Sequence, residues 1–162
     1  MRPNEIRTVF EFNYWAFEKV WDCVMKLNDA QFTEELDYSR DSTRNLVVHM
    51  MSATRRWIIR LNGGEMVPHF ALEDFSTLAA TKDKWDELRA EALDYVNALS
   101  EADLDGIVRW QLPDRGMDTE NTRWEILLHV AITPPTTAPR SWRCSTSTLA
   151  SRPWNRICCS IC

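Results

Sequence analysis

The sequence predicts an all-α protein, a bundle of amphipathic helices followed by a segment of different character. Three observations predict this fold. Apolar residues recur at helical spacing over three long segments, capping residues and glycines separate those segments, and the periodicity stops near residue 131. The chain has 162 residues, of which 44% are hydrophobic and 27% charged, so it is long enough and apolar enough to bury the core of one domain.

The first predicted helix covers residues 3–27. Its apolar residues recur every three or four positions and therefore share one face; the main ones are Ile6, Phe10, Phe17 and Trp21. Pro3 suits the first turn of a helix, where its missing N–H costs nothing. Tryptophans across the helical segments are expected to pack in or beside the core; they are Trp15, Trp21, Trp57, Trp85 and Trp124.

Two further long helices are expected over residues 42–62 and 77–99. Gly63-Gly64 ends the first of them, because glycine readily adopts the left-handed conformation that terminates helices. The apolar stripe of residues 42–62 includes His49, so a histidine is expected on a core-facing side.

A short helical turn over residues 100–106 and a small hairpin over residues 107–116 are expected next. A fourth helix follows and is predicted to be truncated near residue 131. Pro134 and Pro135 account for the truncation, because each proline removes a hydrogen-bond donor and clashes with the preceding turn.

Residues 132–162 differ from the rest in composition. They contain ten Ser or Thr, four Pro, four Arg, and no Lys, Asp or Glu. Because the chain carries a net charge of −5 and this segment contributes +4, residues 1–131 carry −9. We therefore predict a helical bundle over residues 1–131 and an aberrant, poorly ordered tail over residues 132–162.

The acidic body argues against nucleic acid as a partner, since phosphates require a basic face. No stretch of about eighteen apolar residues is present, so no membrane span is expected. The first residues are polar and lead directly into the first helix, which is unlike a signal peptide. The sequence therefore predicts a cytoplasmic protein.

Residues 1–131 resemble the DinB family of helical-bundle proteins. The resemblance rests on the order and spacing of short segments, which are FNYWA at 12–16, LVVHM at 46–50, WIIRL at 57–61 with GE at 64–65, LSEADL at 99–104 and WEILLHV at 124–130. It implies a DinB-like four-helix bundle, often a homodimer. It also implies a metal-dependent enzyme of the thiol transferase or hydrolase type that acts on a small-molecule substrate, with a low-molecular-weight thiol as the candidate co-substrate.

The same resemblance implies a divalent metal, zinc or nickel, held by three histidines. His49 matches the first ligand, and the other two belong to a pattern Asn-His-x-x-x-His-Arg on the fourth helix, where histidines four apart share a face. Here those two positions hold Thr133 and Thr137, whose hydroxyls replace imidazole poorly. His129, one turn earlier, is the candidate for a makeshift second ligand beside His49. The alternative is that both histidines are ordinary partly buried polar residues.

Two functions follow from these alternatives. The first is a DinB-like metal-dependent enzyme, impaired because two of three ligand histidines are missing. The second is a non-catalytic, metal-free helical bundle.

The composition of residues 132–162 also predicts a frameshift. Read one base out of phase, the codons of Ile132-Thr133 and of Thr136-Thr137 can each encode histidine, which restores the family pattern. Tryptophan and cysteine codons begin with TG, and a shifted codon that ends in TG encodes only Leu, Met or Val. The unusual tryptophans and cysteines of the tail would all become apolar residues in that frame.

Overall fold

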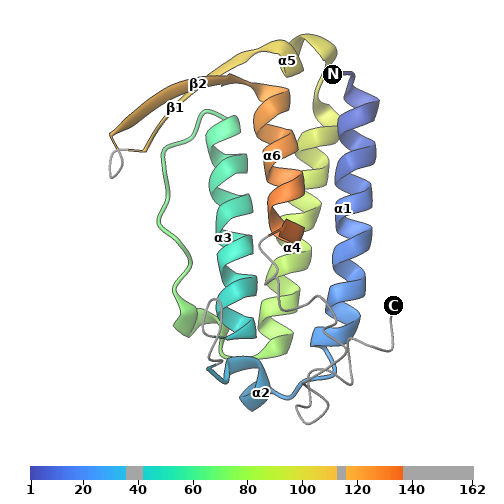
Figure 1. Cartoon of the computed structure of the whole chain (residues 1–162), viewed down its shortest axis with the longest axis vertical. Coiled ribbons are helices and arrows are strands. Elements are labelled where there is room, and N and C mark those ends of the chain that lie inside the picture. The colour runs from blue at the N-terminus through green and yellow to red at the C-terminus, as the bar shows by residue number, and fades with distance from the viewer. Residues whose placement is uncertain (36–41, 113–115, 137–162) are drawn as a thin grey trace, which may run out of the picture.

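The computed structural model describes residues 1–35, 42–112 and 116–136 and confirms the predicted all-α fold (Figure 1). Four long helices form the bundle; they are α1 (Pro3–Val24), α3 (Thr43–Leu61), α4 (Leu78–Ala98) and α6 (Arg123–Thr136). The short elements are α2 (Asp29–Thr33), the 3₁₀ turn η1 (Leu72–Phe75), α5 (Glu101–Asp105), and strands β1 (Ile107–Leu112) and β2 (Met117–Thr122).

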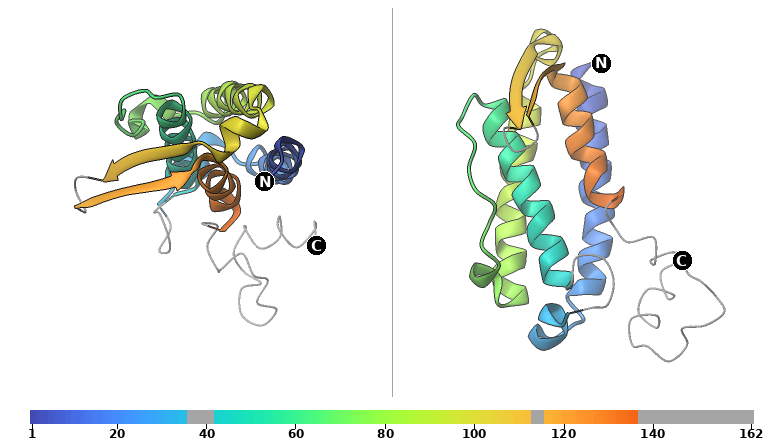
Figure 2. Two further views of the ribbon diagram at one scale, coloured as in Figure 1. Left: turned by 90° about the horizontal axis from the view of Figure 1, so that it is seen from above. Right: turned by 60° about the vertical axis from the view of Figure 1, so that its left-hand side comes forward.

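Each long helix packs against two others. Helices α1 and α3 both contact α4 on one side and α6 on the other. Helices α1 and α6 run in one direction and α3 and α4 in the opposite one (Figure 1). The strands form an antiparallel hairpin that projects across one end of the bundle, beside α5 and the N-terminus (Figure 2). We call this the hairpin end; α2 and η1 lie at the other end.

The boundaries of α3 follow the predicted caps, whereas α1 ends at Val24, three residues before its predicted end. Ser42 accepts a hydrogen bond from the Asn45 amide at 3.0 Å, which starts α3 one residue later. At the other end of α3, Gly63 has φ of +77° and the Gly64 amide donates to the Ile59 carbonyl at 2.9 Å. This is the glycine-dependent termination that the sequence predicts.

The core lies along the predicted stripes of α1 and α4. In α3 the predicted stripe is shifted from the true core face, because Met51 is fully buried whereas His49, on the predicted stripe, is only half-buried. Phe10, Met51, Leu104 and Leu127 come from four different helices and are each at most 1% exposed. Burial of such side chains from every helix is what holds a bundle of this size together, at roughly 1.5–3 kcal/mol for each large apolar side chain.

An aromatic group joins α1 to α4, and we call it the α1–α4 aromatic cluster. The Trp85 ring lies 4.8 Å from that of Phe17 and 6.1 Å from those of Tyr14 and Trp21. All four residues are buried. Of the tryptophans predicted to pack, Trp15 is an exception, because it lies about 200° around the helix from Phe17 and is 58% exposed.

Helix α6 ends at Thr136, five residues beyond the predicted truncation. The φ of proline, about −65°, is itself helical, so Pro134 and Pro135 can follow the helical path for one more turn while two hydrogen-bond donors are lost. The predicted boundary at residue 131 therefore falls inside α6, and residues 137–162 of the predicted tail lie outside the described residues. With 14 residues, α6 is still the shortest of the four long helices and stops before the far ends of α1 and α3 (Figure 1).

None of the helices in the described part of the chain is long and apolar enough to cross a membrane.

Candidate functional site

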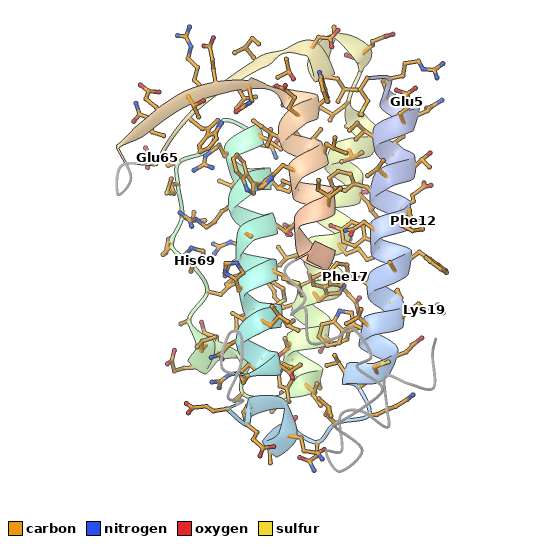
Figure 3. The ribbon with its side chains drawn as sticks, viewed as in Figure 1. Glu5, Phe12, Phe17, Lys19, Glu65 and His69 are labelled. Atoms are coloured by element: carbon orange, nitrogen blue, oxygen red, sulfur yellow. The ribbon has the colours of Figure 1, made fainter. Side chains whose placement is uncertain are left out.

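His49 lies on α3 and is half-buried. Its ring stacks on that of His69, with centroids 6.1 Å apart and planes 16° from parallel. His69 belongs to the connection that runs from the end of α3 back along that helix (Figure 3). It is exposed, and its position against His49 could not be read from the sequence.

His129 lies on α6 and is exposed. Its ring stands edge-on to Trp57 of α3, with centroids 5.9 Å apart. Trp57 is eight residues beyond His49, which is about 12 Å along the helix axis. The structure thus brings His49 together with His69, and His129 together with Trp57.

The donor set in the described residues does not fit a three-ligand metal centre. Across residues 1–35, 42–112 and 116–136, no group of three or more His, Cys, Asp or Glu side chains is placed to hold a metal ion. A catalytic zinc-type site uses three protein ligands and an open position. Of the two positions at which the family pattern has histidine, Thr133 falls within α6 and Thr137 lies outside the described residues.

A second group of rings surrounds Trp57, and we call it the hairpin-end cluster: Trp57, Trp110, His129 and Arg60. Trp110 of β1 meets Trp57 edge-on at 5.2 Å. The guanidinium of Arg60 lies 4.6 Å from the Trp57 ring centroid and 5.6 Å from that of Trp110. Such cation–ring contacts are each stabilising by about 0.5–2 kcal/mol.

The register of the hairpin places Trp110 in this cluster. Arg109 pairs with Glu120 and Gln111 with Asp118, so these four side chains share one face of the hairpin. Trp110 points to the other face, toward the bundle, and its indole N–H donates to Asn121 Oδ1 at 3.0 Å.

Helix α3 is strongly cationic in an acidic protein. It carries Arg44, Arg55, Arg56 and Arg60 and no Asp or Glu. Arg56 contacts His69 Nε2 at 2.5 Å and Met66 Sδ at 2.8 Å, while its buried Nε has no acceptor among the described residues. Burial, and secondarily the Arg56 charge, lowers the pKa of the Arg60 guanidinium.

Arg123, the first residue of α6, fastens the hairpin end. Its guanidinium donates to the Leu61 carbonyl at 2.9 Å, to the Asp103 carbonyl at 3.0 Å and to the Tyr95 hydroxyl. Burial raises the pKa of the Tyr95 phenol, and the neighbouring Arg123 opposes that rise. These bonds tie α3, α4 and α5 to the start of α6.

Residues 14–132 match the DinB superfamily, which is most of the chain. The all-α fold of the described residues agrees with that match. The chain belongs to the DinB superfamily. Among curated proteins, none matches the chain.

Proposed function

We propose that the chain is an impaired form of a DinB-type metal-dependent enzyme, of the thiol transferase or hydrolase type, acting on a small molecule. The observation that carries the proposal is the position of His49, which is half-buried on the helix that packs against α6. Position 133, the place of an expected second histidine, lies in the last turn of α6. The helix pair that would hold a metal is therefore present.

The impairment follows from the ligands. Thr133 and Thr137 supply hydroxyls where imidazoles are expected, and hydroxyls bind zinc-like or nickel-like ions poorly. His49 with His129 is the proposed residual pair. Two histidines hold a divalent ion much more weakly than three, so no catalytic step is assigned to this chain. A thiol as co-substrate and a homodimeric state remain predictions from the resemblance.

We further propose that the impairment arises from a frameshift near codon 131. Sequencing of the coding DNA across codons 125–162 tests this directly. A shifted frame that encodes the two histidines four apart supports the proposal, and a shifted frame without those codons contradicts it.

Metal stoichiometry tests the functional proposal. The chain and a frame-restored version are incubated with zinc or nickel, desalted, and assayed by inductively coupled plasma mass spectrometry. We expect about one metal per restored chain and far less than one for the present chain. His49→Ala in the restored chain should abolish the retained metal, and the matched variant His69→Ala should keep it. A restored chain without metal contradicts the enzyme proposal, and full occupancy of the present chain contradicts the impairment.

The second candidate is a non-catalytic, metal-free bundle. It is favoured by the lack of any three-donor group in the described residues. If both proteins fold and neither retains metal, this candidate replaces the first.

A further inference from the structure

A pocket of about 510 Å³ lies between the end of α3, the connection that follows it, and the hairpin. That volume suits a small organic molecule and exceeds the needs of a bare inorganic ion. Arg60, Trp110 and Met66 line it, together with polar side chains from the exposed face of the hairpin.

Arg60 is held in place within this pocket. Its guanidinium lies over both Trp57 and Trp110, at 4.6 and 5.6 Å from the ring centroids. Contact with two rings restrains the position of this guanidinium, whose planar N–H groups can donate in pairs to a carboxylate.

Among the residues that the structure describes, Arg60 has no ion-pair partner. Within the described part of the chain, no Asp or Glu forms an ion pair with Arg55, Arg56 or Arg60. Glu65 lies between two pocket-lining residues but is exposed and makes no ion pair with Arg60 (Figure 3). Partly burying an unpaired cation costs free energy, which an external anion would offset.

We propose that this pocket binds a small organic carboxylate, with Arg60 as the anchor for the carboxylate and with Trp110 and Met66 against the apolar body. The site needs no metal and goes beyond the proposed enzymatic function. It lies next to the histidine of α6, because Trp57 contacts Arg60, Trp110 and His129 alike.

Asp118 offers a second test of whether the ligand is an anion. It also lines the pocket, where its carboxylate accepts a hydrogen bond of 3.3 Å from Gln111 Nε2. An anionic ligand is repelled by this carboxylate, so Asp118→Asn should tighten binding while Arg60→Gln weakens it. Opposite signs from two neighbouring substitutions are not expected from a loss of packing.

The test uses benzoate as the probe, with the full chain in EDTA, so that metal plays no part and failure here is separate from failure of the metal assay. Binding is followed through the indole N–H resonance of Trp110 in ¹⁵N–¹H NMR spectra, assigned with Trp110→Phe. We expect a saturable shift with benzoate and at least tenfold weaker binding of the uncharged analogue benzamide and of inorganic phosphate.

Substitutions test which side chains bind benzoate. Arg60→Gln should weaken benzoate binding about tenfold or more, Arg60→Lys less, and Asp118→Asn should strengthen it about two- to threefold. Arg44→Gln, an arginine at the other end of the same helix, is the matched control and should change nothing. The proposal is overturned if Arg60→Gln or Arg60→Lys binds benzoate as tightly as the unaltered chain, or if benzamide or phosphate binds as tightly as benzoate.

Discussion

Two groups of tryptophans at different levels of the bundle use the same side chain in different ways. In the α1–α4 aromatic cluster, Trp85 and Trp21 are only 4% and 3% exposed, and Trp85 contacts three other rings. In the hairpin-end cluster, Trp57 and Trp110 are half-buried, and Trp110 lines a pocket. The first group is core, and the second forms part of a surface site.

The charged side chains around the two clusters distinguish the core cluster from the pocket-lining cluster more clearly than burial does. Cations lie over rings in both places: Arg89 is 5.8 Å from the Tyr14 centroid, much as Arg60 is from Trp110. However, Arg89 pairs with Glu18 at 2.6 Å, whereas Arg60 forms no ion pair within the described residues. A cation over an aromatic ring is common and structural. The feature that indicates a ligand at Arg60 is the combination of a cation without an ion pair among the described residues and a position in the lining of a pocket.

The largest expected effect comes from Trp85→Ala in the α1–α4 aromatic cluster. Removing a fully buried indole leaves a cavity between α1 and α4, which typically lowers the free energy of unfolding by about 3–5 kcal/mol. Urea denaturation followed by circular dichroism measures the loss. At temperatures where the variant is still folded, its benzoate affinity should be unchanged. A loss below about 1 kcal/mol would show that this cluster is not the core it resembles.

Trp57→Leu should have the opposite pair of effects, a small loss of stability and a clear loss of benzoate affinity. Because Trp57 is half-buried, truncation should lower the free energy of unfolding by only about 1 kcal/mol. It removes the closer of the two rings under Arg60, so benzoate binding should weaken several-fold. Urea denaturation and benzoate binding are measured again. Equal benzoate affinities for Trp57→Leu and the unaltered chain would show that the Trp57 ring does not support binding in the pocket.

The sequence predicted the long helices well because their boundaries depend on local chemistry. Ser42 and Gly63 mark the limits of α3 through their own hydrogen bonds and backbone angles, and the core stripes follow from burial. The prediction was wrong where it relied on residue type alone and ignored the position of the residue in the helix. Trp15 was assigned to the core by residue type although its angle around α1 turns it outward, and the prolines did not end α6 at residue 131.

The candidate sites could be predicted only in part. His49 was placed on a core-facing stripe by periodicity, and it is half-buried. Its contact with His69 was not predictable, because residue 69 lies in an irregular connection where no period fixes side-chain direction. Trp110 reaches Arg60 only through the register of a hairpin fifty residues away in sequence. The one available signal was the run of arginines without acids in residues 43–61. The pairing of His49 with His129 as metal ligands stays a prediction.

The smallest expected effect is on the pH dependence of stability, which should differ between the two ends of the bundle. At the hairpin end, carboxylates cap the helix starts. Glu125 accepts from the Thr122 hydroxyl and amide at 2.8 and 2.9 Å, and Asp103 accepts from the Ser100 hydroxyl and amide at 2.6 and 2.9 Å. These hydrogen bonds lower the pKa of both carboxyls. At the other end, neutral side chains such as Thr77 cap the helices, although Asp29 also accepts from the Leu78 amide.

A carboxyl whose pKa is lower in the folded state stabilises the fold above its unfolded pKa, and this contribution is lost as the pH falls through the folded value. For Glu125 the loss begins below the ordinary pKa of 4.5. Amide hydrogen exchange at the start of α6 should therefore accelerate between neutral pH and pH 3, after correction for intrinsic rates. Glu125→Gln should reduce this pH dependence, since the amide does not titrate. Thr77→Ala is the control, because losing a hydroxyl cap should speed exchange at the start of α4 equally at both pH values. If the Glu125→Gln variant kept the full acid sensitivity at α6, the carboxylate cap would not be its source.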